Sequence, residues 1–496
     1  MEKVDFLRKK YPRFIYENYF WKISNKNLEI SFDFRIEPNI FFQPKIVINN
    51  VDGPRIKRVG EGTLNNLIFN LGLMEIPSYW KATCSPEIEI KAGPLSMKAS
   101  PSSPSSTNLR FVSMNQEQIK YPSVVKGGDE RKFIDWWKDL IINGMGQFFY
   151  ENKIDWRSKN FLTIECNNGN KYKNFNGKLK NRYLVPFAGG RDSIATLENL
   201  KKKGEMALFL VNPNKQIKKV VKVTGVKKQI IVKRIVDKKL LELNKKGYLN
   251  GHTPFTAVLS FLSVFSAILF NYKNIVFSNE KSANEGNVKY LGKIINHQWA
   301  KSSEFERMFK NYCKKYLAKN VNYFSYLRKY GELEISKMLT KYPKYFPVFS
   351  SCNASMRIGA KQIRWCGNCP KCLFVYMTLF PFLEKKELLK IFGKDIFQNK
   401  RLLPTMKALL RQGSPKPFEC VGTKKESLIA FYLSWKKSRD PVSAELPFLL
   451  RYFERNILPK YPNLEKESKK IIDSWNSQND LPKEFGKVLK KMVFKK

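Results

Sequence analysis

The sequence predicts an α/β fold: a doubly wound parallel sheet, with an N-terminal α+β domain before it and a C-terminal helical region after it. Short apolar runs have the length and composition of buried strands at 183–187, 206–211, 229–236 and 274–278. Between them, apolar residues recur at helical spacing, most clearly over 194–204. Alternating strands and helices are typical of a parallel sheet, which binds ligands at the carboxyl ends of its strands.

Length and composition agree with several folded domains. The chain has 496 residues, and 43% of them are hydrophobic, which excludes a disordered protein. We expect the N-terminal domain to span 1–178, the sheet domain 179–395 and the helical region 396–496. In the helical region, Leu428, Phe431 and Tyr432 form one apolar stripe.

The N-terminal domain carries both strand and helix patterns. Apolar residues alternate from Phe32 to Ile36, again at Ile46 and Ile48, and over 87–91, as expected of strands. The stretch 65–73 resembles a helix that ends at Gly72.

The second half of this domain begins with a change of composition. Residues 97–132 are Ser/Pro-rich and then polar, so they are predicted to form a flexible insertion. The segment 133–150 is predicted to be helical, with one apolar face made by Trp136, Trp137, Leu140 and Ile141. The stretch 155–176 is expected to hold a strand and a loop that leads into the sheet domain.

The chain is organised around the loop after the first of the four predicted strands. This loop reads Ala-Gly-Gly-Arg-Asp-Ser, from Ala188 to Ser193. Two glycines let the backbone approach a phosphate, and the N-terminus of the next helix offers free N–H groups to it. The spacing fits neither Gly-Lys-Ser/Thr nor G-x-G-x-x-G phosphate loops. A tight turn between strand and helix is the alternative interpretation.

The loop resembles the PP-motif of ATP pyrophosphatases, usually Ser-Gly-Gly-x-Asp-Ser. Gly189, Gly190, Asp192 and Ser193 match that pattern, whereas Ala188 stands where the first serine is expected. The resemblance implies the PP-loop type of sheet and assigns all six loop residues, Arg191 as a charge clamp among them, to ATP.

A second polar motif, Asn-Gly-His-Thr-Pro, precedes an uncharged stretch. His252 is one of only two histidines, and an imidazole can move protons near neutral pH. Thr253 is expected to cap the following helix, with Pro254 in its first turn. Residues 253–272 carry no charge and are long enough to span a membrane, but a buried helix of the sheet domain is the preferred interpretation, and no membrane span is expected.

Two further polar segments follow the strand at 274–278. The first, 278–287, contains Glu280, and the second, 296–306, contains His297 with Lys301 and Ser302. At a carboxyl strand end such groups bind hydroxyls, phosphates or a metal. Solvated loop and helix surfaces are the alternative.

Eight cysteines and no signal-peptide core indicate a reducing, intracellular compartment. Cys366, Cys369 and Cys372 form two overlapping C-x-x-C steps, and Cys352 can supply a fourth thiolate. Four thiolates favour a structural Zn²⁺ over an iron–sulfur cluster. Reduced buried cysteines, or a thiol used as an acid/base, are the alternatives.

The net charge of +47, from 90 basic and 43 acidic residues, is compatible with a polyanionic partner. The lysines are spread along the chain without a long basic run, and no RNA-binding aromatic motif is present. Anionic small molecules and a lysine-rich composition are therefore preferred to a nucleic-acid partner.

Seven motifs, in order, resemble the MurL family of UDP-N-acetylmuramoyl-L-alanyl-L-glutamate epimerases. They are Ser-Tyr-Trp-Lys-Ala at 78–82, Gly-Gly-x-Asp-Ser at 189–193, Gly-His-Thr-Pro at 251–254, Ser-Asn-Glu-x-Ser-Ala-Asn-Glu at 278–285, Ser-Ser-Cys-Asn at 350–353, Cys-Gly-x-Cys-Pro-Lys-Cys at 366–372 and Glu-Cys-Val-Gly-Thr at 419–423. The resemblance implies inversion of a terminal L-Glu to D-Glu in a cytoplasmic nucleotide-sugar peptide, dependent on ATP and Mg²⁺, with release of AMP and diphosphate.

This chemistry needs a proton acceptor and a proton donor at the α-carbon. His252, Glu280, His297 and Cys352 are the candidates, in that order. A PP-loop enzyme acting on tRNA, a plain nucleic-acid binder, and a nitrile- or amide-forming enzyme of the QueC type are the alternatives.

Overall fold

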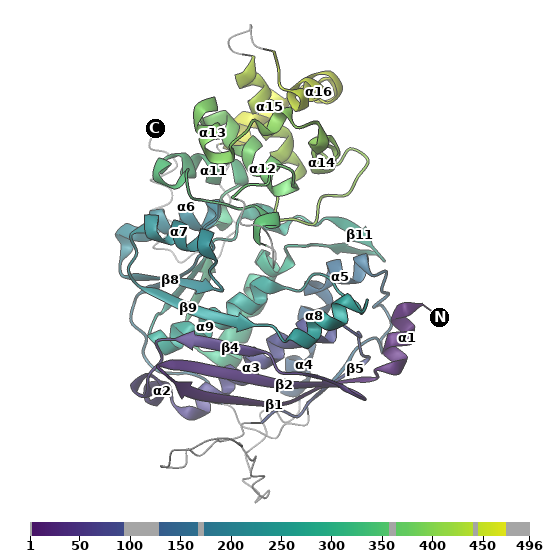
Figure 1. Ribbon diagram of the computed structural model, residues 1–496, viewed down its shortest axis with the longest axis vertical. Coiled ribbons are helices and arrows are strands. Elements are labelled where there is room, and N and C mark those ends of the chain that lie inside the picture. The colour runs from purple at the N-terminus through teal and green to yellow at the C-terminus, as the bar shows by residue number, and fades with distance from the viewer. Residues whose placement is uncertain (1, 94–127, 167–172, 357–363, 440–444, 473–496) are drawn as a thin grey trace, which may run out of the picture. The chain divides into compact units, whose positions relative to one another are not determined.

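The computed structural model (Figure 1) describes residues 2–93, 128–166, 173–356, 364–439 and 445–472. Contacts divide the chain into two compact units. Unit 1 comprises 1–142, 156–175 and 233–250, and unit 2 comprises 143–155, 176–232 and 251–496. Most of the predicted insertion at 97–132 lies outside the described residues, but 128–132 begin helix α4 (Gly128–Gly144).

Unit 1 contains a mixed sheet in the order β4-β2-β1-β5-β6, with β3 also paired to β2. The long strands β1 and β2 form an antiparallel hairpin, whereas β5 and β6 run parallel to β1. The alternating pattern over 32–36 is confirmed, because Phe32, Phe34 and Ile36 are all buried. The strands are β1 (Arg13–Ser24), β2 (Asn27–Ile36), β3 (Ile40–Phe42), β4 (Lys45–Asn49), β5 (Glu87–Ile90) and β6 (Thr163–Cys166).

Helix α3 (Glu61–Trp80) corrects one prediction. The helix does not end at Gly72 but continues for two more turns. Gly72 is needed for packing: a Cβ there would lie 2.0 Å from the hydroxyl oxygen of Tyr16 on β1. The absence of a side chain at Gly72 therefore lets the Tyr16 ring pack directly against the backbone of α3. Unit 1 also contains α1 (Lys3–Lys10), α2 (Gly53–Val59), α8 (Lys238–Lys245) and all but the last two residues of α4.

The predicted helix over 133–150 is in fact two helices. Helix α4 ends at Gly144, Met145 has non-helical angles, and α5 (Gly146–Glu151) follows. A side chain at Gly144 would lie 2.9 Å from the ring of Pro254, so close packing explains the small residue at this break.

Residues 233–250 leave the sheet domain and pack into unit 1. The guanidinium of Arg234 donates to the Glu75 carboxylate at 2.6 Å on both oxygens. The hydroxyls of Tyr248 and Tyr11 lie 2.6 Å apart. These polar contacts join segments that are far apart in the sequence.

The prediction of a parallel sheet is confirmed in part, because the large sheet of this chain is mixed and only its strands in unit 2 are all parallel. The order of these strands is β13-β10-β7-β8-β9, and all four pairings are parallel. The chain proceeds from β7 through β8 to β9 and then returns to the other side of β7, so the order reverses between β7 and β10. Ligands bind at such a switch point, outside the carboxyl ends of the strands. The strands are β7 (Tyr183–Pro186), β8 (Met206–Val211), β9 (Gln229–Ile235), β10 (Asn274–Phe277) and β13 (Asn322–Ser325).

Helices cover both faces of this sheet. Phe324 of β13 belongs to the core formed with α6, α11 and α12. The preceding residue, Tyr323, points to the opposite face, where it contacts Phe309 of α10 and hydrogen-bonds Ser260 of α9 at 2.8 Å. These helices are α6 (Arg191–Leu200), α7 (Lys215–Thr224), α9 (Phe255–Phe270), α10 (Ser303–Tyr312), α11 (Glu332–Thr340) and α12 (Pro370–Leu379).

The uncharged stretch at 253–272 forms the buried helix α9, as predicted. Thr253 does not cap it, because the helix begins one residue later, with Pro254 at the cap position. Among the described residues, no helix combines the length and apolarity that crossing a membrane requires.

The C-terminal region is helical, as predicted, and appears in yellow-green in Figure 1. The stripe Leu428, Phe431 and Tyr432 of α15 is buried, and Phe431 stacks on Phe453 of α16. The helices are α13 (Lys385–Phe392), α14 (Leu403–Leu409), α15 (Lys424–Ser438), α16 (Phe448–Asn456) and α17 (Leu464–Ile472), and a small hairpin of β11 (Val288–Tyr290) and β12 (Lys293–Ile295) precedes them.

Candidate active site

The glycine-rich loop lies between β7 and α6, as the sequence predicts. Gly189 has a positive φ of 72°, which favours glycine. Gly190 occupies the cap position of α6, and a Cβ there would lie 2.9 Å from the Ser351 hydroxyl oxygen. The first glycine is therefore required by conformation and the second by close packing.

The loop borders a cavity of about 230 Å³ at the carboxyl ends of β7, β8 and β10. One part of its wall is apolar and comes from β8, α7 and α9. The other part is polar and comes from the loop, the end of β10 and Lys301. The residues that line the cavity include Ala188, Gly190, Asp192, Ser193, Phe209, Val211, Ile217, Phe255, Ser278, Asn279 and Lys301.

Asp192 lines the cavity with 24% of its side chain exposed, while its Oδ1 accepts a hydrogen bond from Arg191 Nε at 2.9 Å. Burial raises the pKa of this carboxyl, but the nearby cations Arg191, Lys371 and Lys301 outweigh burial and lower it. The Ser193 hydroxyl donates to the Gly190 carbonyl at 3.0 Å. The loop thus presents a carboxylate whose pKa is lowered, which suits a hydrated divalent cation.

Arg191 does not line the cavity. Its side chain is only 1% exposed and forms an ion pair with Glu332 of α11. It also donates to Ser336 at 3.0 Å and to Thr378 of α12 at 3.3 Å. The residue predicted as a charge clamp on ATP is placed between helices, where it anchors the start of α6.

Lys301 connects the cavity to Cys420. Its ammonium donates to the Cys420 sulfur at 3.3 Å. Burial alone would lower the pKa of Lys301, yet the neighbours Cys420, Glu280 and Asp192 raise it above its usual value. Ser302, predicted to help hold phosphate, caps α10 by accepting the Phe305 N–H at 3.1 Å.

Lys371 is a second buried lysine near Asp192. Its ammonium donates to the Cys420 carbonyl, and its backbone N–H donates to the Glu419 carboxylate at 2.9 Å. Burial lowers the pKa of Lys371, and the charge of Asp192 opposes that effect. Sequence analysis assigned no role to Lys371 or to Cys420, although the Cys-Pro-Lys-Cys and Glu-Cys-Val-Gly-Thr motifs contain them.

The two histidines lie together, with ring centroids 4.5 Å apart. The Gln147 side-chain oxygen lies 2.5 Å from His297 Nδ1, and its amide nitrogen donates to Glu151 at 2.7 Å. On the other side, His297 Nε2 lies 4.0 Å from the Cys420 sulfur. Burial, followed by the charge of Lys301, lowers the pKa of His297 to about 4, so the imidazole is neutral at neutral pH.

Glu280 is 2% exposed, and its Oε2 atom has no hydrogen-bond partner within the part of the chain that the structure describes. The Ser278 hydroxyl, which lines the cavity, also lacks a partner there. By contrast, Asn279 donates to Ser325 at 3.0 Å. Buried polar atoms without partners are rare in proteins and indicate a missing ligand or water.

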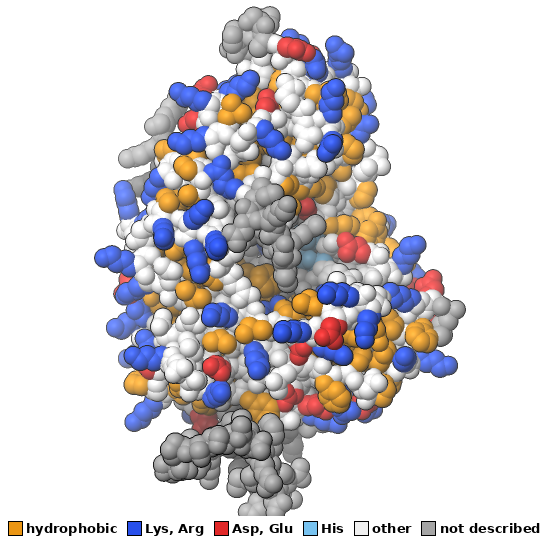
Figure 2. All heavy atoms as spheres, viewed as in Figure 1, with side chains coloured by type: hydrophobic (Ala, Val, Ile, Leu, Met, Phe, Trp, Pro, Cys, Tyr) orange, Lys and Arg blue, Asp and Glu red, His pale blue; other side chains and the backbone are white. Residues whose placement is uncertain are grey.

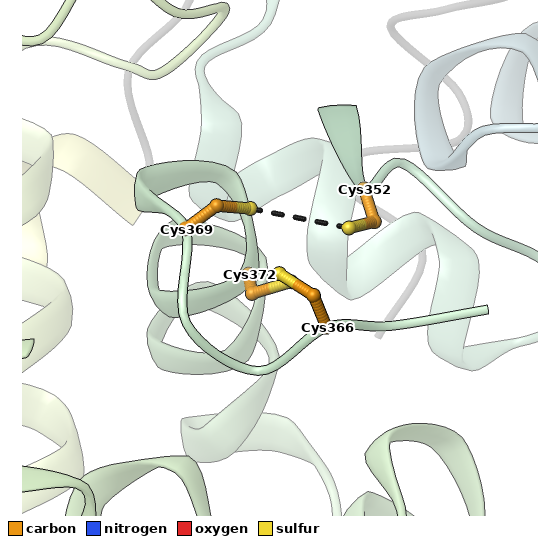
Figure 3. A group of neighbouring side chains, drawn as sticks. All are labelled: Cys352, Cys366, Cys369 and Cys372. Atoms are coloured by element: carbon orange, nitrogen blue, oxygen red, sulfur yellow. Dashed lines mark hydrogen bonds between the residues drawn. The ribbon is translucent and has the colours of Figure 1, made fainter. Parts of the chain in front are cut away.

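The four predicted metal-ligating cysteines form one cluster (Figure 3). The sulfurs of Cys352, Cys366, Cys369 and Cys372 all lie within 4.8 Å of one another and point to a common centre. Sulfur separations are 4.0 Å for Cys352–Cys369 and 3.7 Å for Cys366–Cys372. Tetrahedral Zn–S bonds of 2.3 Å imply roughly 3.8 Å between sulfurs, so the cluster fits a zinc ion. Cys352, also predicted as a proton carrier, is fully buried among these ligands.

Comparisons with known proteins agree with the family resemblance. Residues 116–326 match the family model of the MurL N-terminal domain, and residues 348–451 match that of the MurL C-terminal domain. Relatives named UDP-N-acetyl-alpha-D-muramoyl-L-alanyl-L-glutamate epimerase include one from Salinispora tropica, 38% identical over 258 residues, which are 52% of this chain and 56% of the relative.

A relative of the same name from a Micromonospora species is 37% identical over 253 residues, 51% of this chain and 56% of the relative. Another from Xanthomonas oryzae pv. oryzae is 33% identical over 308 residues, 60% of this chain and 68% of the relative. The matched region thus spans a little over half the length of the first two relatives.

Proposed function

The chain belongs to the MurL family, and from this premise we propose that it inverts the terminal L-Glu of UDP-MurNAc-L-Ala-L-Glu to D-Glu in peptidoglycan precursor synthesis. ATP is the proposed co-substrate, cleaved to AMP and diphosphate. The relatives carry the name of this activity. Because both substrates are nucleotides of the cytoplasm, we propose that the enzyme works there.

The observation that supports ATP binding most directly is the glycine-rich loop at the switch point of a parallel sheet. We propose that this is a nucleotide domain of the PP-loop ATP pyrophosphatase type. The backbone from Ala188 to Gly190 and the first turn of α6 would hold the phosphates through N–H groups. The apolar wall, with Phe209, Val211 and Ile217, provides a surface for the adenine ring.

Asp192 fits a role in holding Mg²⁺, because its carboxylate stays ionised and faces the cavity. The Ser278 hydroxyl, which has no hydrogen-bond partner among the described residues, is a further oxygen in the same wall. When bound, Mg²⁺ would neutralise phosphate charge and help diphosphate to leave.

The residues of this site can lower the barrier to removing the α-proton. Transfer of AMP to the α-carboxylate of the terminal glutamate removes that negative charge and makes the neighbouring C–H more acidic. Loss of the proton then places charge on an enolate oxygen. Lys301, whose pKa is raised by its anionic neighbours, provides positive charge in the cavity wall that can stabilise such an oxygen.

Of the proposed proton carriers, His252 and His297 lie together, and Glu280 is close enough to affect Lys301. Cys352 sits in the sulfur cluster instead. We propose that the four cysteines hold a structural zinc ion, which when bound would cross-link the segment at 350–352 to the start of α12.

Exchange of the α-hydrogen with deuterated water tests the function. With UDP-MurNAc-L-Ala-L-Glu we expect deuterium in the product D-Glu only when ATP and Mg²⁺ are both present. An ATP analogue blocked between the α- and β-phosphates should prevent the exchange. Chiral analysis of the released glutamate and measurement of AMP complete the experiment. Exchange without ATP would contradict an adenylate, and AMP formation without inversion would favour a different PP-loop enzyme.

The four-cysteine cluster and the glycine-rich loop do not by themselves separate the proposed activity from that of a nitrile- or amide-forming enzyme, which the deuterium experiment distinguishes. A tRNA-directed activity would need a basic surface. Lys and Arg side chains are spread over the face seen in Figure 2 and do not gather into one patch. The basic residues therefore do not form a continuous patch of the kind that binds nucleic acid on that face.

A further inference from the structure

Cys420 differs in its surroundings from the four cysteines of the cluster. It is half-buried and follows Glu419 in the loop that leads to α15. Its sulfur accepts a hydrogen bond from the Lys301 ammonium at 3.3 Å and lies 4.0 Å from His297 Nε2. The thiol thus has a hydrogen-bond donor on one side and, on the other, an imidazole nitrogen that can accept its proton.

The orientation of His297 makes it a partner for this thiol. The Gln147 amide group donates to the Glu151 carboxylate, so its oxygen faces His297 Nδ1 and accepts that proton. With the proton on Nδ1, the lone pair of Nε2 faces Cys420. Glu151 and Gln147 thus select the tautomer that can take a proton from sulfur.

Cys420 is also close to the place where an adenylate would form. Lys301 lines the cavity with Asp192 and donates to the Cys420 sulfur. Lys371 donates to the Cys420 carbonyl and interacts electrostatically with Asp192. The α-carbon of an acyl-adenylate is bonded directly to the activated carboxyl carbon. A proton carrier must therefore lie within a few ångströms of the α-phosphate. Cys420 meets this requirement, because a single side chain, that of Lys301, separates it from the cavity that Asp192 lines.

We propose that Cys420 is a proton carrier at the α-carbon of the terminal glutamate, with His297 Nε2 as its proton-exchange partner. This inference rests on the proposed function. In one direction the thiolate sulfur takes the α-proton, and the C–H electron pair moves into the enolate. A second carrier returns a proton to the opposite face of the same carbon. Cys420 then releases its proton to solvent through His297 Nε2, and the second carrier regains a proton from solvent, so both carriers return to their starting states. In the reverse direction the thiol is the donor.

The test compares Cys420→Ala and Cys420→Ser with the matched control Cys166→Ser, a half-buried cysteine on β6 in unit 1. Three quantities are measured with the full-length chain. They are exchange of labelled diphosphate into ATP in the presence of UDP-MurNAc-L-Ala-L-Glu, deuterium incorporation starting from each epimer separately, and net inversion. Thermal unfolding confirms that each variant is folded.

We expect both Cys420 variants to retain diphosphate exchange and to lose inversion by about 10²–10⁴-fold, the usual contribution of a general acid–base group. Deuterium incorporation should be lost starting from at least one epimer, and the control should resemble the wild type. Inversion and incorporation close to wild-type rates in Cys420→Ala would overturn the proposal. Loss of diphosphate exchange in both folded variants would also overturn it, because Cys420 would then serve nucleotide binding.

A covalent role gives a different result. If the thiolate attacked the activated carboxyl group, the wild-type protein would accumulate a thioester of the substrate, visible as an added mass on Cys420. That observation would contradict the proposal and would show that Cys420 is a nucleophile instead of a proton carrier. Failure of the proposed function itself is seen separately, since the wild-type protein would then show no ATP-dependent incorporation at all.

Discussion

The hydroxyl oxygen of Ser351 accepts a hydrogen bond from the backbone N–H of Arg191 at 3.4 Å. Ser351 is the neighbour of a cluster cysteine, and Arg191 is the first residue of the helix that follows the glycine-rich loop. The N–H of Ser350 also donates to the Gly189 carbonyl at 3.4 Å. The segment that carries Cys352 is therefore attached directly to the loop that we assign to ATP.

Removal of the metal should weaken both stability and nucleotide binding. We expect Cys369→Ser to lose bound zinc and to unfold at a lower temperature, because binding to such ligands contributes to folding. The affinity for ATP, measured by titration calorimetry, should fall as well, since the 350–352 segment supports the loop. Cys313→Ser is a control for losing a buried cysteine outside the cluster. Zinc-free protein with unchanged stability and ATP affinity would contradict a structural metal.

A double substitution can test the contact beneath the loop. Gly190→Ala places a Cβ 2.9 Å from the Ser351 hydroxyl oxygen, too close for these atoms, so the loop or the Ser351 side chain must shift and ATP affinity should fall. Ser351→Ala removes the obstructing oxygen and should restore part of the loss. Binding of ATP to the two single variants and the double variant is the measurement. No recovery in the double variant would mean that the Ser351 side chain does not limit the loop.

Asp192→Asn should leave the fold intact and abolish diphosphate release. The change keeps the size of the side chain and removes the charge that faces the cavity. We expect a drop of at least about 10²-fold in AMP formation, comparable to the loss of a charge-stabilising group in other active sites. Thermal unfolding serves as the control for folding. A folded variant that releases diphosphate at the wild-type rate would contradict the assignment of this loop to the ATP site.

His297 predicts how stability changes with pH. Its folded pKa, about 4, is below the usual value of 6.5, so the unfolded chain binds the extra proton between these values. The free energy of unfolding is not reduced by this group above pH 6.5. As the pH falls from 6.5 towards 4, protonation of the unfolded chain lowers the free energy of unfolding by about 3 kcal/mol at most. Urea unfolding at pH 7.5 and pH 4.5 should therefore show a smaller loss for His297→Gln than for the wild type. Equal losses would contradict a buried neutral imidazole.

Much of the fold could be predicted from local patterns. Four short apolar runs predicted β7, β8, β9 and β10, and the uncharged run predicted the buried helix α9. Such patterns work because burial on one or both faces imposes a period on neighbouring residues. Gly72 shows the limit: a glycine in a helix usually indicates an end, but here it makes room for Tyr16, which lies far away in the sequence.

The cysteine cluster was predictable for a related reason, since three of its four ligands lie within seven residues. The loop from Ala188 to Ser193 was likewise contiguous. Arg191 was assigned to ATP from its place in that loop, whereas its side chain turns towards Glu332 on a distant helix. The direction of a side chain depends on the helices that pack around it, and no local pattern contains that information.

Local patterns were enough to predict the order of strands and helices, the glycine-rich loop, the four thiolates and, through the order of its motifs, the family. The meeting of Lys301, Lys371 and Cys420 beside Asp192 could be seen only in the folded chain. These residues are spread over more than two hundred positions, and each is an ordinary residue within its own segment. They meet because the parallel sheet directs successive loops to one edge and the C-terminal segment returns to it, and that proximity arises from packing between distant segments.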